Sequence, residues 1–341
     1  MVNAIGIAVR VNDPYNDPRA LLYIKACYLY GVPSFIFPVS EIDTYLQSGY
    51  MNAFRWTANG LERFKTDAPR FCEYYASLKP LQDSNPQWFQ WIIDNTVLTD
   101  EFGMTKERLQ REMLMSPLCQ YAIPTFPVRK YQELVRMLPT VPNALLKPAD
   151  GSLGVGIMRL ITKNNTVQYL TMDASGEFSE EVFNDYRSSL SKNYQSFLLE
   201  PCINILSKDE RATDFRVQVS LNEHAQWEIG FSCARIGGNN IASNFERGGS
   251  LTTPELAIAS FDVENVEEKV REMHWLALEV ANLVQKRSKS AVSCLGIDIC
   301  IDRDSKQLYV IEANSKPGGR IISLFHLAEI RAGYFKYLLS M

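Results

Sequence analysis

Short apolar runs and amphipathic stretches alternate at the start of the chain. Residues 4–9 (AIGIAV) predict a buried strand, and Arg19–Tyr30 has helical spacing that ends at Gly31-Val32-Pro33. A second apolar run, SFIFPV, follows directly. Strand, helix and strand in this order predict the beginning of an open α/β unit. Over residues 41–100 aromatics and prolines alternate without a clear period, so the pattern predicts no definite element there.

From residue 105 onward the pattern predicts helices separated by many short strands. We expect helices over Thr105–Met115, 177–194, 264–287 and about 323–332. We expect strands over 144–148, 156–161, 197–200, 214–221, 226–235, 295–302 and 308–314. The apolar stripe of the longest helix comprises Val266, Val270, Met273, Leu276, Val280 and Leu283. Four prolines between residues 124 and 142 predict a linker-rich region.

The segment LGIDICIDRDSKQLYVIEAN, residues 295–314, predicts two strands joined by the polar loop Arg303–Gln307. If Asp302 pairs with Leu308, Asp298 lies opposite Glu312, and Gly296 lies opposite Asn314 with open space beside it. Because side chains alternate along a strand, the residues between these positions predict a packing face on the opposite side of the hairpin. Its members are Ile297, Ile299, Ile301, Tyr309, Ile311 and Ala313.

Two carboxylates that face each other across a strand pair repel, so we expect a cation between Asp298 and Glu312. Oxygen ligands in this number suit Mg²⁺, which accepts one or two carboxylates and leaves its other positions to water and phosphate. The alternative is a solvated sheet face on which lysines or water bridge the carboxylates. Asn314 on the same face, followed by the segment SKPGG, favours the metal.

A glycine-rich loop forms the second candidate feature. In LLKPADGSLGVGIMRL, residues 145–160, Lys147 ends a predicted strand and Gly151, Gly154 and Gly156 lie in the loop that follows. Glycines let backbone N–H groups approach an anion closely, and a lysine adds positive charge for phosphate. The loop lacks the Gly-Lys-Ser/Thr of a Walker A motif and the helix of a dinucleotide fingerprint. By itself it is usually a turn, but together with the carboxylate hairpin it predicts the phosphate part of a nucleotide site.

Two arginines in the middle segment are further candidates. Arg216 follows Thr213-Asp214-Phe215, and Arg235 precedes Ile236-Gly237-Gly238. A guanidinium can bind phosphate or carboxylate through two parallel hydrogen bonds. The alternative is that both arginines form ordinary surface ion pairs, which contribute little.

Composition restricts the class of protein. At about 150 residues per domain, 341 residues suggest roughly two structural units, and 46% hydrophobic residues suffice for a core. The net charge of −4 argues against nucleic-acid binding. Seven cysteines, an odd number without a CxxC pair, indicate reduced thiols and a cytoplasmic location. We predict no signal peptide, because Met1–Arg10 lacks a positive n-region followed by an apolar h-region. We predict no membrane span, because Lys25, Gly31 and Pro33 interrupt the most apolar stretch. Neither GxSxG nor HExxH is present.

Several motifs in order carry a resemblance to a known family. They are Lys106, Lys147 with DGSLGVG, FLLEP, DFRV, ARIGG, SNFERGG, LGIDICID and IEANSKPGG. The chain resembles the ATP-grasp superfamily, most closely the YheC/YheD-type proteins of spore-forming bacteria. It is also similar to the ribosomal-protein glutamate ligase, glutathione synthetase and D-alanine–D-alanine ligase branches. The motifs lie within about residues 100–330, and before them only the order strand, helix, strand matches the family's preceding domain.

The resemblance implies an α+β and α/β architecture, namely an ATP-grasp fold preceded by a Rossmann-like N-terminal domain. It implies an N-terminal domain over 1–100, a central subdomain with the glycine-rich loop over 101–200, and a C-terminal subdomain with the magnesium site over 201–341. It also implies ATP and Mg²⁺ as cofactors. The superfamily is often dimeric, so a homodimer is one expectation for the assembly.

The resemblance also implies four groups of site residues. The nucleotide group comprises Lys106, Lys147, Gly151, Ser152, Gly154, Gly156, Glu200, Cys202, Ile203 and Asp214. The magnesium ligands are Asp298, Glu312 and Asn314. The catalytic group is Arg235, Lys147 and Asn314. The residues that meet the acceptor substrate are Arg216, Asn244, Gly248, Gly249, Lys316 and Arg320.

Within the nucleotide group, Lys106 and Lys147 look like the two phosphate-facing lysines, and Glu200–Ile203 looks like the adenine hinge. Since Pro201 has no N–H, the resemblance requires the next two residues of the hinge, Cys202 and Ile203, to donate to the ring. Asp214 matches the position that usually takes the ribose hydroxyls. Its nearby rivals are Asp209 and Glu210.

The implied reaction uses ATP to phosphorylate a carboxylate, after which an amine attacks the acyl phosphate and forms an amide or peptide bond. We expect the substrates to be a small carboxylate and an amine, such as an amino acid or a peptide. Two alternatives stay open. The first is a small-molecule kinase on the same fold, and the second is a nucleotide-binding, spore-coat-associated type of protein without turnover.

Overall fold

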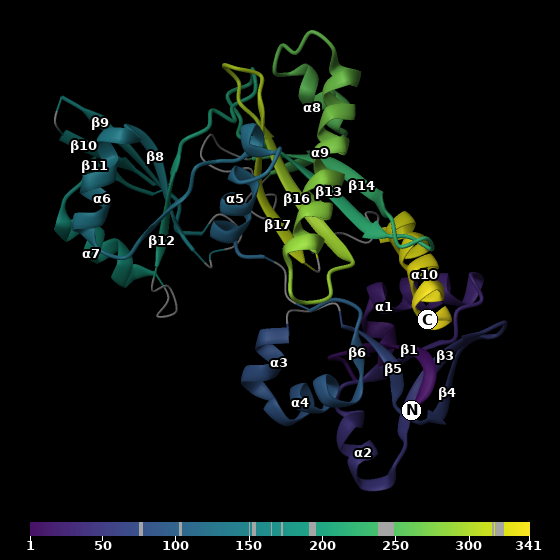
Figure 1. The fold of residues 1–341 in the computed structure, drawn as a ribbon. Helices are drawn as coiled ribbons and strands as arrows, with labels where there is room; N and C mark the ends of the chain where they lie inside the picture. Colours follow the sequence, from purple (N-terminus) through teal and green to yellow (C-terminus); the bar gives the residue numbers. More distant parts are fainter. Residues whose placement is uncertain are drawn as a thin grey trace.

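Three β-sheets organise the chain, one after another along the sequence (Figure 1). The computed structural model describes residues 1–74, 78–101, 104–149, 151, 155–164, 166–171, 173–190, 196–237, 249–315, 317 and 324–341. In Figure 1 the N-terminal sheet is purple to blue, the second sheet is teal, and the third runs from green to yellow. The mixture of sheets and helices agrees with the predicted α/β and α+β class.

The N-terminal sheet has six strands in the order β4-β3-β2-β1-β5-β6. The strands are β1 (Val2–Val9), β2 (Ser34–Pro38), β3 (Met51–Thr57), β4 (Gly60–Thr66), β5 (Pro69–Tyr74) and β6 (Val97–Leu98). Strands β2, β1, β5 and β6 are parallel, whereas β3 and β4 form an antiparallel hairpin at the edge. Its helices are α1 (Pro18–Leu29), α2 (Glu41–Ser48), α3 (Leu78–Ser84) and α4 (Pro86–Asn95).

The first strand and helix form where the apolar pattern predicts them. The six residues that end β1 are buried, as expected for a strand covered on both faces. Helix α1 begins at Pro18, and the side chain of Asp17 caps it by accepting from the N–H groups of Arg19 and Ala20. Gly31, with φ of +68°, follows the helix in the left-handed region that favours glycine. The ordered elements between residues 41 and 100 have no counterpart in the sequence prediction.

The second sheet has the strand order β11-β10-β9-β8-β12-β7. Its strands are β7 (Phe126–Val128), β8 (Asn143–Pro148), β9 (Met158–Lys163), β10 (Thr166–Leu170), β11 (Ser175–Glu177) and β12 (Phe197–Pro201). Helices α6 (Tyr131–Met137) and α7 (Glu180–Ser189) accompany it. The expectation of a linker between residues 124 and 142 was therefore wrong. Three of its prolines lie in or beside regular elements: Pro127 in edge strand β7, Pro139 in a single 3-10 turn and Pro142 just before β8.

The third sheet has the strand order β15-β14-β13-β16-β17. The strands are β13 (Thr213–Leu221), β14 (Trp227–Ile236), β15 (Ser250–Thr252), β16 (Cys294–Ile301) and β17 (Leu308–Ser315). Its helices are α5 (Lys106–Leu114), α8 (Pro254–Ala259) and α9 (Val266–Arg287). The predicted stripe of α9 is confirmed, since Val270, Met273, Leu276 and Val280 are buried in the core of this part. Short 3-10 turns elsewhere span Pro14–Asn16, Cys119–Tyr121 and Leu138–Thr140.

The last helix returns the chain to the N-terminal sheet. Helix α10 (Phe325–Ser340) is longer than predicted, and its residues Ala328, Ala332 and Phe335 pack in one apolar cluster with Ile5, Ile7 and Ile24. Figure 1 shows the yellow helix beside α1, with the two chain ends on the same side of the molecule. This packing joins the first and last parts of the chain.

A buried polar cluster connects the same regions. The guanidinium of Arg331 on α10 is fully buried and forms ion pairs with Glu73 at the end of β5 and with Asp100 after β6. Asp100 in turn accepts from the backbone N–H of Ser293 at 2.6 Å, just before β16. One cationic side chain thus links the N-terminal sheet to the third sheet.

Two further predictions concern the whole chain. All seven cysteines are free thiols, as the odd count suggested. In the parts of the chain that the structure describes, none of the helices combines the length and the apolar character needed to cross a bilayer. The cytoplasmic location and the domain boundaries at residues 100 and 200 stay predictions.

Candidate functional site

The two carboxylates of the predicted hairpin face each other. Asp298 on β16 pairs with Glu312 on β17, and Gly296 pairs with Asn314, as the alternation pattern predicted. Three side chains were expected to hold a metal, namely two carboxylates and one amide. They therefore lie at neighbouring positions of one strand pair. The residues come together because both strands expose alternate side chains to the same face.

Between Asp298 and the loop of the hairpin, the predicted register was wrong. A bulge lies between the pairs Asp298–Glu312 and Ile299–Val310, and Ile301 rather than Asp302 pairs with Leu308. The extra residue on β17 reverses the alternation beyond it. Val310 and Leu308 therefore enter the core, whereas the sequence pattern placed Ile311 and Tyr309 there.

The space beside Gly296 is filled. A Cβ atom at this position would lie 2.7 Å from Cβ of Pro317 and 3.2 Å from Cδ of Arg216. The expectation of open space was therefore wrong. The missing side chain instead lets the arginine and the proline approach the backbone of β16 closely.

Asp298 is the centre of the charged cluster and is 2% exposed. Arg216 on β13 binds both of its oxygens, with Nη2 2.9 Å from Oδ2, and Nη2 of Arg235 on β14 lies 3.0 Å from Oδ2. Burial would raise the pKa of this carboxyl, but the two guanidinium groups outweigh it and lower the pKa to about 2. Asp298 is thus held as a carboxylate.

Asp214 belongs to the same cluster. It pairs with Arg235 across β13 and β14, and it accepts from Nε and Nη2 of that arginine at 2.6 and 2.7 Å. Both of its oxygens are engaged, and the residue is 7% exposed. The expected contact of Asp214 with ribose hydroxyls stays a prediction. The rivals, Asp209 and Glu210, are exposed on the turn before β13.

Glu312 and the glycine-rich loop meet at Lys106. The Nζ atom of this lysine lies 3.0 Å from Oε2 of Glu312 and donates to the carbonyl of Gly151 at 2.6 Å. Asn314 donates to the other oxygen of Glu312 at 2.7 Å. Lys106 is the first residue of α5, which Thr105 caps. Lys106 was predicted as a site residue from the family resemblance. In the structure it contacts both the carboxylate hairpin and Gly151 of the loop.

Lys147 is paired with the predicted hinge. Its Nζ atom lies 2.5 Å from Oε2 of Glu200, and Thr125 donates to Oε1 of the same carboxylate at 3.0 Å. Both charged residues are buried, on the neighbouring strands β8 and β12. Thr125 was not among the predicted site residues, because no local sequence pattern singles it out.

The two hinge residues that were expected to donate to an adenine ring differ in whether their backbone N–H group is already used. The N–H of Cys202 donates to the carbonyl of Asn143 at 2.9 Å and is already used within the second sheet. Within the described residues, the N–H of Ile203 forms no hydrogen bond. Only Ile203 therefore offers a donor in this arrangement.

Several predicted residues lie outside the part of the chain that the structure describes. They are Ser152, Gly154, Asn244, Gly248, Lys316 and Arg320. Gly249 is half-buried and immediately precedes β15. Gly156 has φ of +71°, in the region that favours glycine, and its carbonyl accepts from the hydroxyl of Tyr186. The roles of all these residues stay predictions.

Comparison with known proteins identifies the family of the chain. The family model described as YheC/D-like ATP-grasp matches residues 98–340, well over half of the chain. The chain belongs to the YheC/D-like ATP-grasp family. The predicted family is therefore confirmed.

Two curated relatives come from Bacillus subtilis (strain 168). The chain is 22% identical to endospore coat-associated protein YheD over 338 residues, which cover 93% of this chain and 72% of YheD. It is 25% identical to endospore coat-associated protein YheC over 220 residues, which cover 63% of this chain and 59% of YheC. The chain thus spans less than two thirds of YheC.

Solved structures support the fold. The crystal structure of D-cycloserine synthetase DcsG superposes with a TM-score of 0.56 at 11% identity, over 98% of this chain and 100% of that chain. At this identity the likeness concerns the fold alone. The predicted ATP-grasp fold is therefore confirmed.

The carboxylate hairpin of this ATP-grasp protein has the donor set that magnesium prefers. Asp298, Glu312 and Asn314 offer only hard oxygen ligands on one face, and two carboxylates are the number that Mg²⁺ accepts from a protein. Within the described residues, no group of three or more His, Cys, Asp or Glu side chains could hold a metal ion, so the candidate set consists of two carboxylates and one amide. Lysine and arginine nitrogens contact these oxygens, so side-chain cations neutralise the two carboxylates in this arrangement. The residues fit the metal that the family implies.

Proposed function

We propose that this protein is an ATP-dependent carboxylate–amine ligase that works through an acyl phosphate. The observation that carries the proposal is the shared cluster of Asp298, Glu312 and Asn314 with the cations Lys106 and Arg235. It provides oxygen ligands for a metal and positive charge for phosphate within one site. Membership of the ATP-grasp family supports the assignment of ATP.

The hairpin would hold magnesium through Asp298, Glu312 and Asn314. When bound, magnesium would neutralise phosphate charge during phosphoryl transfer. Asp298 is suited to this role because its lowered pKa keeps it ionised throughout the physiological range. Glu312 is less buried than Asp298, with side-chain exposures of 22% and 3%.

The lysines and arginines of the cluster would bind the phosphates and the reacting centre. Lys106 lies beside the carbonyl of Gly151 and would meet the phosphates there, and Lys147 would do so from β8. In the first step a carboxylate oxygen of the substrate attacks the γ-phosphorus, and ADP leaves with the electron pair of the broken bond. In the second step the amine attacks the acyl carbon, phosphate leaves, and the amine loses a proton. Arg235 would stabilise the negative charge that develops in both steps.

A mixture of ATP, Mg²⁺ and panels of amino acids and short peptides tests the proposal. We expect ADP and phosphate to form only when both a carboxylate and an amine are present, with a condensed product that mass spectrometry detects. The variant Glu312→Gln should lose this activity, and the exposed Glu267→Gln on α9 should keep it. ADP formation without an amine, with a phosphorylated product, would identify a kinase. Nucleotide binding without turnover on any of these substrates would support the coat-associated alternative.

A further inference from the structure

The side chain of Gln110 lies buried between three parts of the proposed site. It stands on α5 four residues after Lys106, so the two side chains lie on the same face of the helix. From that face Lys106 contacts Glu312 of the hairpin and the carbonyl of Gly151. Gln110 is 1% exposed, and its amide contacts the backbone of two other segments.

The amide nitrogen of Gln110 binds the bulge of β17. Its Nε2 atom donates to the carbonyl of Val310 at 2.6 Å and lies 3.4 Å from the carbonyl oxygen of Ile311. Ile311 is the extra residue of the bulge, and Glu312 follows it directly. Since β17 is the edge strand of the third sheet and a bulge interrupts its ladder, this side chain supplies a contact that the ladder lacks. The position of Glu312 therefore depends on Gln110.

The amide oxygen of Gln110 anchors the segment that precedes β7. Its Oε1 atom accepts from the backbone N–H of Ile123 at 2.7 Å. Two residues later, Thr125 donates to Oε1 of Glu200, and Oε2 of that carboxylate binds Lys147. One amide thus connects the carboxylate hairpin to the segment that supports the pair of Lys147 and Glu200.

Only a primary amide of this length satisfies both sides. A backbone carbonyl only accepts and a backbone N–H only donates, so Nε2 must face Val310 and Oε1 must face Ile123. A methionine has nearly the same length and shape but can pair with neither group. Buried polar groups without a partner are costly, so the backbone on both sides should shift when the amide is removed.

We propose that Gln110 is a positioning residue, which holds Glu312 in place for the metal. The proposal rests on the metal site of the proposed function. The amide of Gln110 is engaged by backbone groups, so it acts through Val310 and Ile311 on Glu312 rather than as a ligand. Substituting a residue that orients a metal ligand typically weakens metal binding by about tenfold to hundredfold.

Titration of the protein with Mn²⁺ in the presence of ADP tests this role. Mn²⁺ takes the same oxygen ligands as Mg²⁺, and its paramagnetic resonance signal falls as the free ion binds. We expect Gln110→Met to weaken Mn²⁺ binding by about tenfold to hundredfold. Unchanged affinity in this variant would overturn the proposal.

A double variant tests whether Gln110 acts through Glu312. Glu312→Gln removes one carboxylate ligand and should weaken Mn²⁺ binding by itself. If Gln110 acts through that carboxylate, the variant with both substitutions binds Mn²⁺ no more weakly than Glu312→Gln alone. Losses that multiply in the double variant would show that the two residues act independently, which would overturn the proposal.

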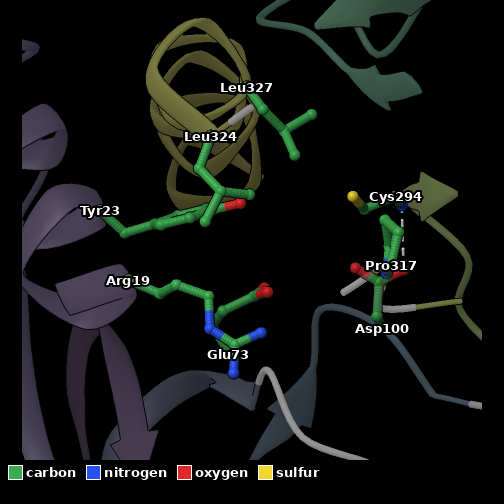
Figure 2. A pocket seen from close by; sticks show the side chains of 8 residues that line it. All are labelled: Arg19, Tyr23, Glu73, Asp100, Cys294, Pro317, Leu324 and Leu327. Carbon is green, nitrogen blue, oxygen red and sulfur yellow. Dashed lines mark hydrogen bonds between the residues drawn. The ribbon is translucent and has the colours of Figure 1, made fainter. Parts of the chain in front are cut away.

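Asp100 provides a matched control, because it is also buried and also binds the backbone of a strand in the third sheet. Figure 2 shows Asp100 beside Cys294, the first residue of β16, with a hydrogen bond between them. Asp100→Asn loses the ion pair with Arg331, so it should lower the midpoint of thermal unfolding and leave Mn²⁺ affinity unchanged. An equal loss of Mn²⁺ affinity in Asp100→Asn and Gln110→Met would assign the effect to general destabilisation and overturn the proposal.

A shorter amide covers the case in which Gln110→Met does not fold. Gln110→Asn keeps a polar group at this position but is one methylene shorter, so it cannot reach both Val310 and Ile123. We expect this variant to fold, as circular dichroism can show, and to bind Mn²⁺ more weakly than the wild type. Failure of both variants to fold would assign Gln110 to the stability of the fold alone and overturn the positioning role.

The outcomes separate this proposal from the proposed function. Weaker Mn²⁺ binding in Glu312→Gln together with unchanged binding in Gln110→Met would refute the positioning role and keep the metal site. Mn²⁺ binding that depends on both residues, without ADP formation on any substrate, would support the positioning role and refute the ligase. Unchanged Mn²⁺ binding in Glu312→Gln, or no binding by the wild type, would refute the metal site and this proposal with it.

Discussion

Arg235 on β14 reaches across the intervening strand β13 to Asp298 on β16, with 3.0 Å between Nη2 and Oδ2. On the way it binds Asp214 of β13, and Arg216 of the same strand binds Asp298 as well. Two arginines and two carboxylates therefore alternate across three adjacent strands. Since all four are largely buried, each charge depends on its neighbours for stabilisation.

The first prediction concerns Asp298 and pH. Its pKa is lowered to about 2 in the folded protein, so the stabilisation it provides is present above the unfolded pKa of roughly 3.9. That stabilisation is lost as the pH falls from about 4 to about 2, and it amounts to about 2 kcal/mol. We expect Asp298→Asn to remove this part of the pH dependence of the free energy of unfolding. Urea denaturation of both proteins between pH 7 and pH 2 measures it, and equal slopes in the two proteins would contradict it.

The second prediction concerns Lys147 and Glu200. Lys147→Met should destabilise the fold by about 3–5 kcal/mol, because it leaves the carboxylate of Glu200 buried without a cation. The double variant Lys147→Met with Glu200→Gln should recover much of that stability. If Lys147 also binds phosphate, the double variant still binds ATP more weakly than the single variant Glu200→Gln. Thermal unfolding together with nucleotide titration separates the two roles, and full recovery of ATP affinity would restrict Lys147 to structure.

The third prediction concerns Gly296. In Gly296→Ala the new methyl group would lie 2.7 Å from Pro317 and 3.2 Å from Arg216, so one or both must move. We expect a loss of about 1–3 kcal/mol in unfolding free energy from overpacking. Urea denaturation of both proteins measures this loss. Unchanged stability in Gly296→Ala would contradict the expected overpacking.

The fourth prediction concerns Arg331. Arg331→Met should destabilise the protein by about 3–5 kcal/mol, since Glu73 and Asp100 both lose their buried cation. Burial raises the pKa of Asp100 and Arg331 opposes that rise, so without the arginine Asp100 should take up a proton at higher pH. Arg55→Met, at an exposed ion pair with Glu62, is the control and should cost less than about 1 kcal/mol. Chemical denaturation compares them, and a similar cost for both would contradict a linking role of Arg331.

Much of the local structure was predictable because strands and helices repeat their side-chain directions with fixed periods. The period of two placed Asp298 and Glu312 on one face, and helical spacing identified the buried face of α9. Their direct pairing was predicted from the contact of Asp302 with Leu308, which is one residue out, and the bulge on β17 offsets that error. The bulge on β17 could not be foreseen, because a single extra residue has no mark in the alternation that precedes it. The elements between residues 41 and 100 were missed for a similar reason, since several short elements there leave no sustained period.

The sequence by itself determined the candidate site residues: the carboxylates of the hairpin, the two lysines, and the arginines of DFRV and ARIGG. Only the tertiary structure decided their partners. The strand order β14-β13-β16 is not the order along the chain, so the contact of Arg235 with Asp298 cannot be derived from spacing. The buried ion pair of Arg331 with Glu73 likewise exists because α10 brings the end of the chain back against its beginning. Charges separated by long stretches of sequence acquire partners through packing, and packing depends on every element at once.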